Sequence, residues 1–99
     1  MITKQHLKSR PVCKVTFELS PEYEADTLAL IGSFNDWAPV PFKKLKNGKW
    51  KRQLELEAGQ QMQFRYQGTT GERMWWDNDP AADRQIPNEY GDTNSWIAC

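Results

Sequence analysis

The sequence predicts an all-β protein, built as one antiparallel β-sandwich. Short segments in which apolar and polar residues alternate recur about every ten residues, which is the spacing of strands in β-sandwiches. Gly, Pro, Asn and Asp separate these segments, and no stretch has the period of an amphipathic helix. The chain of 99 residues is long enough for a single domain with one modest core.

The N-terminal part of the chain begins with a polar stretch that has no period. We therefore expect residues 1–11 to be a flexible arm and residues 12–99 to be the folded domain. The segment Val12–Leu19 is apolar at every second position and predicts a half-buried strand. Ser20–Asp26 is acidic and opens with Ser-Pro, which favours a loop or a single helical turn. Thr27–Ile31 is a short apolar run and predicts the next strand.

The middle of the chain contains the strongest local signal, Asn47-Gly48. This dipeptide supports a type I′ turn, so Phe42–Leu45 and Lys49–Glu57 are predicted to form a β-hairpin. Val40–Leu45 is expected to be a short edge strand, whose prolines block pairing with another chain. Arg52 falls on the apolar face of the return strand, where a charged residue is out of place.

The C-terminal half predicts three further strands and one long connection. Gln61–Tyr66 alternates, with its apolar side chains directed inward and its polar side chains outward. Arg73–Asp77 is a short strand, and Asn94–Ala98 is expected to close the sandwich. The polar segment Asn78–Thr93 lies between them, and connections of more than about 12–15 residues are usually functional or disordered.

The composition excludes several classes of partner and location. The chain has 13 basic and 13 acidic residues, so it has no field that attracts nucleic acid or an anionic membrane, and neither is expected as a partner. Two cysteines, Cys13 and Cys99, do not make a disulfide scaffold, and no stretch has the pattern of a signal peptide or a membrane span. We therefore expect a cytoplasmic protein with both thiols reduced.

The sequence predicts no catalysis, no metal and no cofactor. Its one histidine, His6, lies in the expected arm without a partner, and no Cys or His cluster has the spacing of a metal site. A glycosidase needs two flanking carboxyl groups. The acidic candidates are Asp36, Asp77, Asp79 and Asp83. All four lie in turn-forming contexts, where aspartate usually bonds the backbone, so structural roles are expected for them.

Tryptophan is the residue type that points to a binding surface. Five tryptophans cannot all be fully buried in so small a domain, since each ring needs roughly 150–250 Å² of cover. Trp37 lies in a turn, and of the strand neighbours Trp75 and Trp76 one must face outward. Trp50 and Trp96 lie in alternating segments and are expected to be ordinary structural residues. An exposed ring suits a sugar or a nucleobase, and the neutral charge favours the sugar.

Five short motifs follow one another in order along the chain. They are G-S-F-N-D-W (32–37), N-G-K-W-K-R-Q-L-E-L-E-A-G (47–59), F-R-Y (64–66), W-D-N-D-P-A-A-D-R (76–84) and P-N-E-Y-G-D-T-N-S (87–95). Together they resemble family-48 carbohydrate-binding modules, which include the glycogen-binding domains of AMP-activated kinase β-subunits and the N-terminal early-set domains of isoamylases. The ending is similar to small bacterial members. The resemblance implies an immunoglobulin-like sandwich that binds α-1,4-glucans without catalysis.

The resemblance also implies a set of site residues. Trp37 and Trp76 match the two tryptophans on which the family stacks sugar rings. Arg65 falls where many members have a lysine that bonds sugar hydroxyls, and Asn94 matches an asparagine that bonds the glucan. Tyr90 stands where kinase-type members place an apolar residue inside the curved oligosaccharide.

Two positions depart from the family pattern. The usual short turn before the second tryptophan is replaced by the longer segment Gln67–Met74. Asp92 stands where kinase-type members have threonine. Some isoamylase-type members keep the fold with weak or no sugar binding.

Three hypotheses for the function follow. The leading one is a non-catalytic module that binds α-1,4-glucan such as glycogen, starch or maltooligosaccharides. A glucan-processing enzyme or a second copy of the chain is a candidate partner. The alternative is a protein-interaction or regulatory module that keeps the fold without the sugar site, in which case Trp37 and Trp76 are buried or face a partner. The third, a small glycosidase, needs two carboxyl groups about 5–10 Å apart in a cleft.

Overall fold

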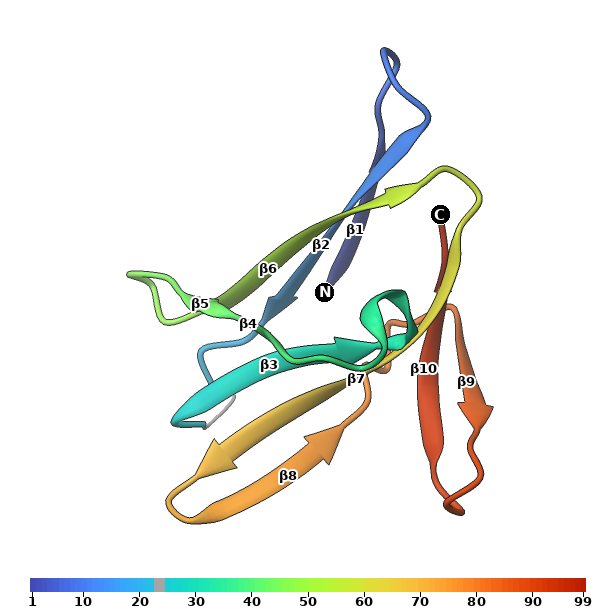
Figure 1. Cartoon of the computed structure of the whole chain (residues 1–99). Coiled ribbons are helices and arrows are strands. Elements are labelled where there is room, and N and C mark those ends of the chain that lie inside the picture. The colour runs from blue at the N-terminus through green and yellow to red at the C-terminus, as the bar shows by residue number, and fades with distance from the viewer. Residues whose placement is uncertain (23–24) are drawn as a thin grey trace.

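The computed structural model describes residues 1–22 and 25–99, which form two antiparallel β-sheets facing each other (Figure 1). The first sheet, in spatial order, contains β1 (Ile2–His6), β2 (Val12–Leu19), β6 (Trp50–Glu57) and β5 (Lys43–Lys44). The second sheet contains β4 (Val40–Pro41), β3 (Thr27–Gly32), β7 (Gln61–Thr70), β10 (Thr93–Ala98) and β9 (Arg84–Pro87), with β8 (Arg73–Asp77) paired to β7. A 3-10 turn, η1 (Ser33–Asn35), follows β3. The predicted all-β antiparallel sandwich is confirmed.

Residues Ile2–His6 form an edge strand within the segment 1–11, which the sequence predicted to be a flexible arm. Within this segment β1 pairs with β2, so that Ile2 lies opposite Phe17 and His6 opposite Cys13. Backbone pairing at a sheet edge does not require an apolar period, which is why the sequence pattern did not indicate this strand. The expected loop or helical turn over Ser20–Asp26 includes residues 23 and 24, which lie outside the described residues.

The core lies between the two sheets and is formed by the alternating positions of their strands. Phe17 from β2 and Phe64 from β7 meet edge to face, with ring centroids 5.2 Å apart. The buried core residues are Cys13, Val15, Phe17, Leu19, Leu28, Leu30, Phe42, Trp50, Leu56, Met62, Phe64, Tyr66 and Ile97. The inward positions predicted for β2 and β7 are therefore confirmed. Trp96 is half-buried, with the Arg84 guanidinium 5.2 Å from its ring centre.

The predicted hairpin around Asn47-Gly48 is confirmed, but its turn is of a different type. Gly48 has a φ of 86°, whereas Asn47 is not left-handed, so the turn is not type I′. The Gly48 amide donates to the Leu45 carbonyl at 2.9 Å, and the Leu45 amide donates to the Lys49 carbonyl at 2.8 Å. This is a three-residue loop in which a left-handed glycine follows a tight turn, an arrangement next in frequency to the two-residue turns.

The segment Val40–Leu45 crosses from one sheet to the other and is not a single edge strand. β4 pairs with β3 in the second sheet, and β5 pairs with β6 in the first. The crossing also explains the unexpected Arg52, which lies opposite the buried Phe17. Its Nη1 donates to the Pro41 carbonyl at 3.3 Å, so the guanidinium bonds the backbone of the crossing segment.

β7 is the strand that organises the second sheet. β3 pairs along one edge of β7, while the other edge is shared, first with β10 and then with β8. The connection Asn78–Thr93, expected to be one long loop, contains β9, which pairs with β10. β9 shortens the irregular parts of this connection to two segments, one on each side of it.

Both cysteines are free thiols. Cys13 is fully buried in the core, as its alternating position predicted. Burial raises the pKa of the Cys99 thiol to about 12, and a contact with Cys13 adds to the shift. No helix in residues 1–22 and 25–99 has the length and apolarity of a bilayer-spanning segment.

Candidate functional site

The turn after β3 presents Trp37 to solvent. At Gly32 a Cβ atom would lie 2.7 Å from the Gln63 carbonyl oxygen and 2.8 Å from the Phe34 ring, so only glycine fits there. Asp36 and Trp37 then both adopt left-handed backbone angles, with φ of 58° and 64°. Such angles cost about 1–3 kcal/mol in residues other than glycine, and they cluster at functional sites. The Trp37 amide donates to the Gly32 carbonyl at 2.8 Å and closes the turn, leaving the side chain 38% exposed.

The hairpin of β7 and β8 decides which of the adjacent tryptophans faces outward. The Trp75 ring packs against the core and covers Gly68, where a Cβ atom would lie 2.3 Å from the ring. Alternation then directs Trp76 to the outer face, where it is 48% exposed. Its indole Nε1 donates to Gln67 Oε1 at 3.2 Å, which fixes the orientation of the ring. Trp76 is therefore the exposed member of the pair.

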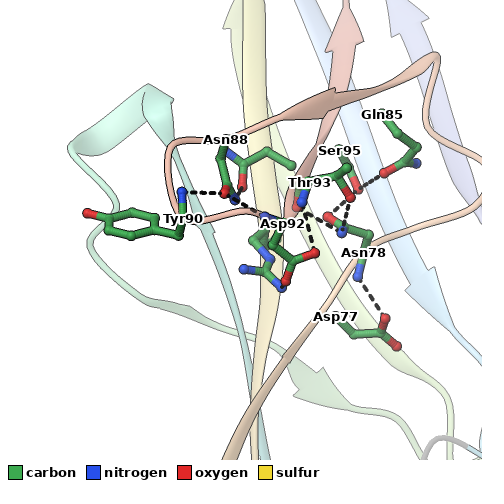
Figure 2. A network of polar contacts seen from close by, with 10 residues as sticks. Asp77, Asn78, Gln85, Asn88, Tyr90, Asp92, Thr93 and Ser95 are labelled. Atoms are coloured by element: carbon green, nitrogen blue, oxygen red, sulfur yellow. Dashed lines mark hydrogen bonds and ion pairs between the residues drawn. The ribbon is translucent and has the colours of Figure 1, made fainter.

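The loop between β9 and β10 is ordered by the side chain of Asn88. Asn88 Oδ1 accepts from the backbone amides of Tyr90 at 3.0 Å and Asp92 at 3.1 Å. Gly91, with a φ of 79°, allows the chain to reverse. Tyr90 lies at the tip, 86% exposed, and its ring points away from the polar network shown in Figure 2.

A polar network beneath this loop attaches it to the sheet (Figure 2). Asn78 Nδ2 donates to the Thr93 carbonyl at 2.9 Å, and the Ser95 hydroxyl donates to Asn78 Oδ1 at 3.0 Å. The buried carboxylate of Asp79 accepts from the Tyr66 hydroxyl at 2.5 Å. The structural roles expected for Asp77, Asp79 and Asp83 agree with these contacts, because each accepts a backbone amide proton.

All five side chains that the resemblance singled out line one surface cavity of about 560 Å³. They come from the turn after β3, from β7, from β8, from the loop before β10 and from β10 itself. The lining residues are Ile31, Trp37, Gln63, Arg65, Trp76, Asn88, Glu89, Tyr90 and Asn94. Sequence reasoning missed Ile31, Gln63, Asn88 and Glu89 as lining residues. The alternation of β7, which places Gln63 on the same face as Arg65, could have indicated Gln63.

Arg65 and Asn94 form the polar floor of the cavity, and both are already engaged. Arg65 Nη2 lies 3.0 Å from Asp92 Oδ2, and its buried Nε has no partner among the described residues. Asn94 is only 8% exposed, donates to Gln63 Oε1 at 3.0 Å and accepts from Asn88 at 3.2 Å. Asn94 keeps a second N–H and a second lone pair for a ligand.

The chemistry of this cavity is that of a binding surface. Two exposed indole rings can cover the apolar face of a ligand, while Arg65, Gln63 and Asn94 can bond its hydroxyl groups. Among the described residues, no group of three or more His, Cys, Asp or Glu side chains could hold a metal ion. The lining can thus contact a ligand that has one apolar face and several hydroxyl groups.

The fold belongs to the class of immunoglobulin-like early-set β-sandwiches. No protein-family model and no curated protein sequence matches this chain. Among solved structures, the pullulanase of Paenibacillus barengoltzii complexed with maltohexaose and alpha-cyclodextrin matches with a TM-score of 0.59 and 21% identity, over 85% of this chain and 13% of that chain. A mutant of that pullulanase complexed with maltotetraose matches with a TM-score of 0.57 and 22% identity, over 83% and 13% of the chains. The chain thus resembles a small part of these enzymes, and the likeness is one of fold.

Proposed function

We propose that this domain is a non-catalytic module that binds α-1,4-glucan chains, and that it belongs with the family-48 modules. One observation carries the proposal. The five residues inferred from the resemblance lie up to 57 positions apart in the sequence, between Trp37 and Asn94, and they line the same cavity. The pullulanase of which a part has a similar fold has been crystallised with maltooligosaccharides, which supports a ligand of this chemistry.

The proposed mode of binding combines stacking and hydrogen bonds. A glucose ring offers an apolar C–H face that suits Trp37 and Trp76, while its hydroxyls meet Arg65 and Asn94. Tyr90, at the loop tip, contacts the inner side of a curved chain. A shallow site of this kind is expected to bind weakly, with a Kd of about 0.1–1 mM.

Weak binding gains from avidity on a branched polymer, where many chain ends are close together. The domain is therefore proposed to act with a glucan-processing enzyme or as a self-associated module. The likeness to 13% of a pullulanase chain supports the first of these two arrangements, action together with an enzyme.

The two other hypotheses have less support. A protein-interaction module without a sugar site predicts buried tryptophans or tryptophans that face a partner. Trp37 and Trp76 are both exposed, which argues against the first form, and the titration below distinguishes the second form from a sugar site. A glycosidase needs two converging carboxyl groups, but among the lining residues in the described part of the chain Glu89 is the one carboxylate. Asp92, which lies next to the cavity, is paired with Arg65.

Tryptophan fluorescence titrated with glycogen and with maltoheptaose tests the proposal, on the unmodified chain and on Trp37→Ala. We expect saturable quenching in the unmodified chain and an affinity lower by about tenfold or more in the folded variant. Cellohexaose, a β-1,4-linked glucan, serves as the matched ligand control and should give no saturable change. No response up to about 10 mM maltoheptaose would contradict the proposal and favour a protein partner.

A further inference from the structure

The apolar surface of the second sheet continues beyond the cavity along β8. Met74 is 50% exposed and precedes Trp76 by two residues. Side chains two positions apart on a strand point to the same face, about 7 Å from each other. Met74 therefore lies next to Trp76 on the outer face, yet it is not among the residues that line the cavity.

The packing of the intervening tryptophan holds this arrangement in place. The Trp75 ring lies against the core over Gly68, and its indole Nε1 donates to Thr70 Oγ1 at 3.0 Å. With Trp75 directed inward, its neighbours Met74 and Trp76 are both directed outward. The exposure of Met74 is thus a consequence of β8 pairing with β7.

β7 places polar side chains next to the exposed apolar pair Met74 and Trp76. Gln67 lies opposite Trp76 and Thr69 lies opposite Met74, and side chains directly opposite each other have Cβ atoms about 4.5–5.5 Å apart. Gln67 bonds the Trp76 indole through its oxygen, which leaves its amide N–H groups for another acceptor. The Thr69 hydroxyl shares a hydrogen bond of 2.6 Å with the Thr27 hydroxyl.

The clustering of exposed apolar side chains indicates that Met74 belongs to the same surface as the cavity. The large apolar residues that are exposed in the described part of the chain are Met1, Trp37, Met74, Trp76 and Tyr90. Three of them line the cavity and Met74 adjoins it, whereas isolated exposed apolar residues are expected to be scattered. In Figure 1 the hairpin of β7 and β8 extends away from β10. Met74 lies nearer the tip of this hairpin than Trp76 does, on the side of Trp76 away from β10.

We infer that Met74, together with Gln67 and Thr69, forms a further sugar subsite at the end of the cavity. The occupant is the next part of a glucan chain that the cavity already holds, so the inference rests on the proposed function. The flexible, polarizable thioether adapts to the C–H face of a sugar ring. The amide and hydroxyl groups of β7 meet the sugar hydroxyls. The segment Gln67–Met74, longer here than in the family, would then serve to recognise longer chains.

Chain-length dependence tests this subsite. The indole N–H signals of the full chain are followed by NMR during titration with maltotriose and with maltoheptaose. Met74→Ala is expected to lower the affinity for maltoheptaose about three- to tenfold and to change that for maltotriose by less than about twofold. Longer chains also gain affinity from having more binding registers, so the decisive quantity is the part of the gain that Met74→Ala removes.

Two variants control for trivial effects. Arg73→Ala removes the neighbouring side chain, which alternation directs to the other face of β8, and it should leave both affinities unchanged. Met74→Leu keeps an apolar side chain of similar size and should retain most of the gain for maltoheptaose.

Each outcome distinguishes the subsite from the proposed function. If Met74→Ala binds maltoheptaose as the unmodified chain does, the subsite is excluded and the proposed function stands. Equal losses for both oligosaccharides would also exclude a separate subsite, because Met74 would then belong to the cavity. If neither oligosaccharide shifts any signal of the unmodified chain, the proposed function itself fails.

Discussion

The outer faces of the two sheets differ, although both sheets contribute to one core. On the first sheet, cross-strand neighbours of opposite charge or matching polarity cover the surface. Lys14 lies opposite Glu55, and Gln53 Nε2 donates to Thr16 Oγ1 at 3.1 Å. These pairs make a solvated face of the kind that a sandwich normally presents.

The second sheet presents aromatic and apolar side chains on its outer face instead. Trp76 and Met74 are exposed to solvent on this face, and Trp76 lines the same cavity as Trp37. The first sheet shows that a polar outer face is compatible with this core, so folding does not require exposed rings. The exposed apolar side chains on the second sheet are therefore not explained by the stability of the fold.

The strongest way to sharpen this comparison is to remove the two adjacent tryptophans in turn. Trp75→Ala is expected to lower the free energy of unfolding by about 2–4 kcal/mol, because a partly buried ring leaves the core. Trp76→Ala should lower it by less than about 1 kcal/mol and lower the affinity for maltoheptaose at least tenfold. Urea denaturation and ligand titration of both variants measure the two effects. A large loss of stability in Trp76→Ala would contradict the division between core and surface.

A methyl group at Gly68 tests whether the core positions the outer face. Gly68→Ala forces its Cβ atom into the Trp75 ring and is expected to cost about 2–3 kcal/mol of stability. Gly59→Ala is the matched control, since no atom in residues 1–22 and 25–99 beyond its chain neighbours lies within 4 Å of its Cβ position, and its φ of 84° is what resists the substitution. We expect that variant to cost about 1 kcal/mol, and to leave glucan affinity unchanged. Equal stability losses in the two variants would show that the contact with Trp75 is not tight.

Neutralising one carboxylate on each face gives a smaller, more specific contrast. Asp92→Asn removes the partner of Arg65, and we expect the affinity for maltoheptaose to fall about threefold as the guanidinium becomes mobile. Glu55→Gln removes the exposed partner of Arg10 on the first sheet and should not change the affinity. An unchanged affinity in Asp92→Asn would show that the ion pair does not position Arg65.

The smallest expected effect concerns a contact between the sheets. The Lys4 ammonium, 2.6 Å from Asp83, and the Ala98 amide hold the pKa of the Asp83 carboxyl below its ordinary value of 3.8. The charged form is favoured in the folded state, so its contribution is present above about pH 4 and is lost as the pH falls through the lowered pKa. The contribution should stay below about 1 kcal/mol because the pair is partly exposed. Thermal unfolding of Asp83→Asn between pH 2 and about 6 should show a weaker acid dependence than the unmodified chain.

Local signals in the sequence were sufficient for the elements that combine alternation with a core position. The strands β2 and β7 follow from period-two patterns, and the hairpin around Gly48, though not the type of its turn, follows from the Asn-Gly dipeptide. β1 has no such signal, because its pairing uses backbone groups and only Ile2 packs against the core. The crossing over Val40–Leu45 depends on which sheet each half meets, and a local pattern does not contain that information.

The candidate site likewise contains residues that the sequence indicated and residues that only the structure could reveal. The resemblance indicated Trp37, Arg65 and Trp76, and the structure places them on one cavity. Ile31 lies opposite Arg65 because β3 pairs with β7, so its place in the cavity could be inferred only with knowledge of the strand register. The ion pair between Arg65 and Asp92 joins residues 27 positions apart, which no spacing rule predicts.

The alternation of β7 has a consequence for how the chain can change in length. Met62, Phe64 and Tyr66 point into the core, while the positions between them face the cavity. Deleting one residue within this strand would exchange the two rows, so that polar groups enter the core and apolar groups enter the cavity. Insertions and deletions should therefore be tolerated at the hairpin tip near Gly71, where no atom of the described residues beyond its chain neighbours lies within 4 Å of a Cβ position, and rejected within β7.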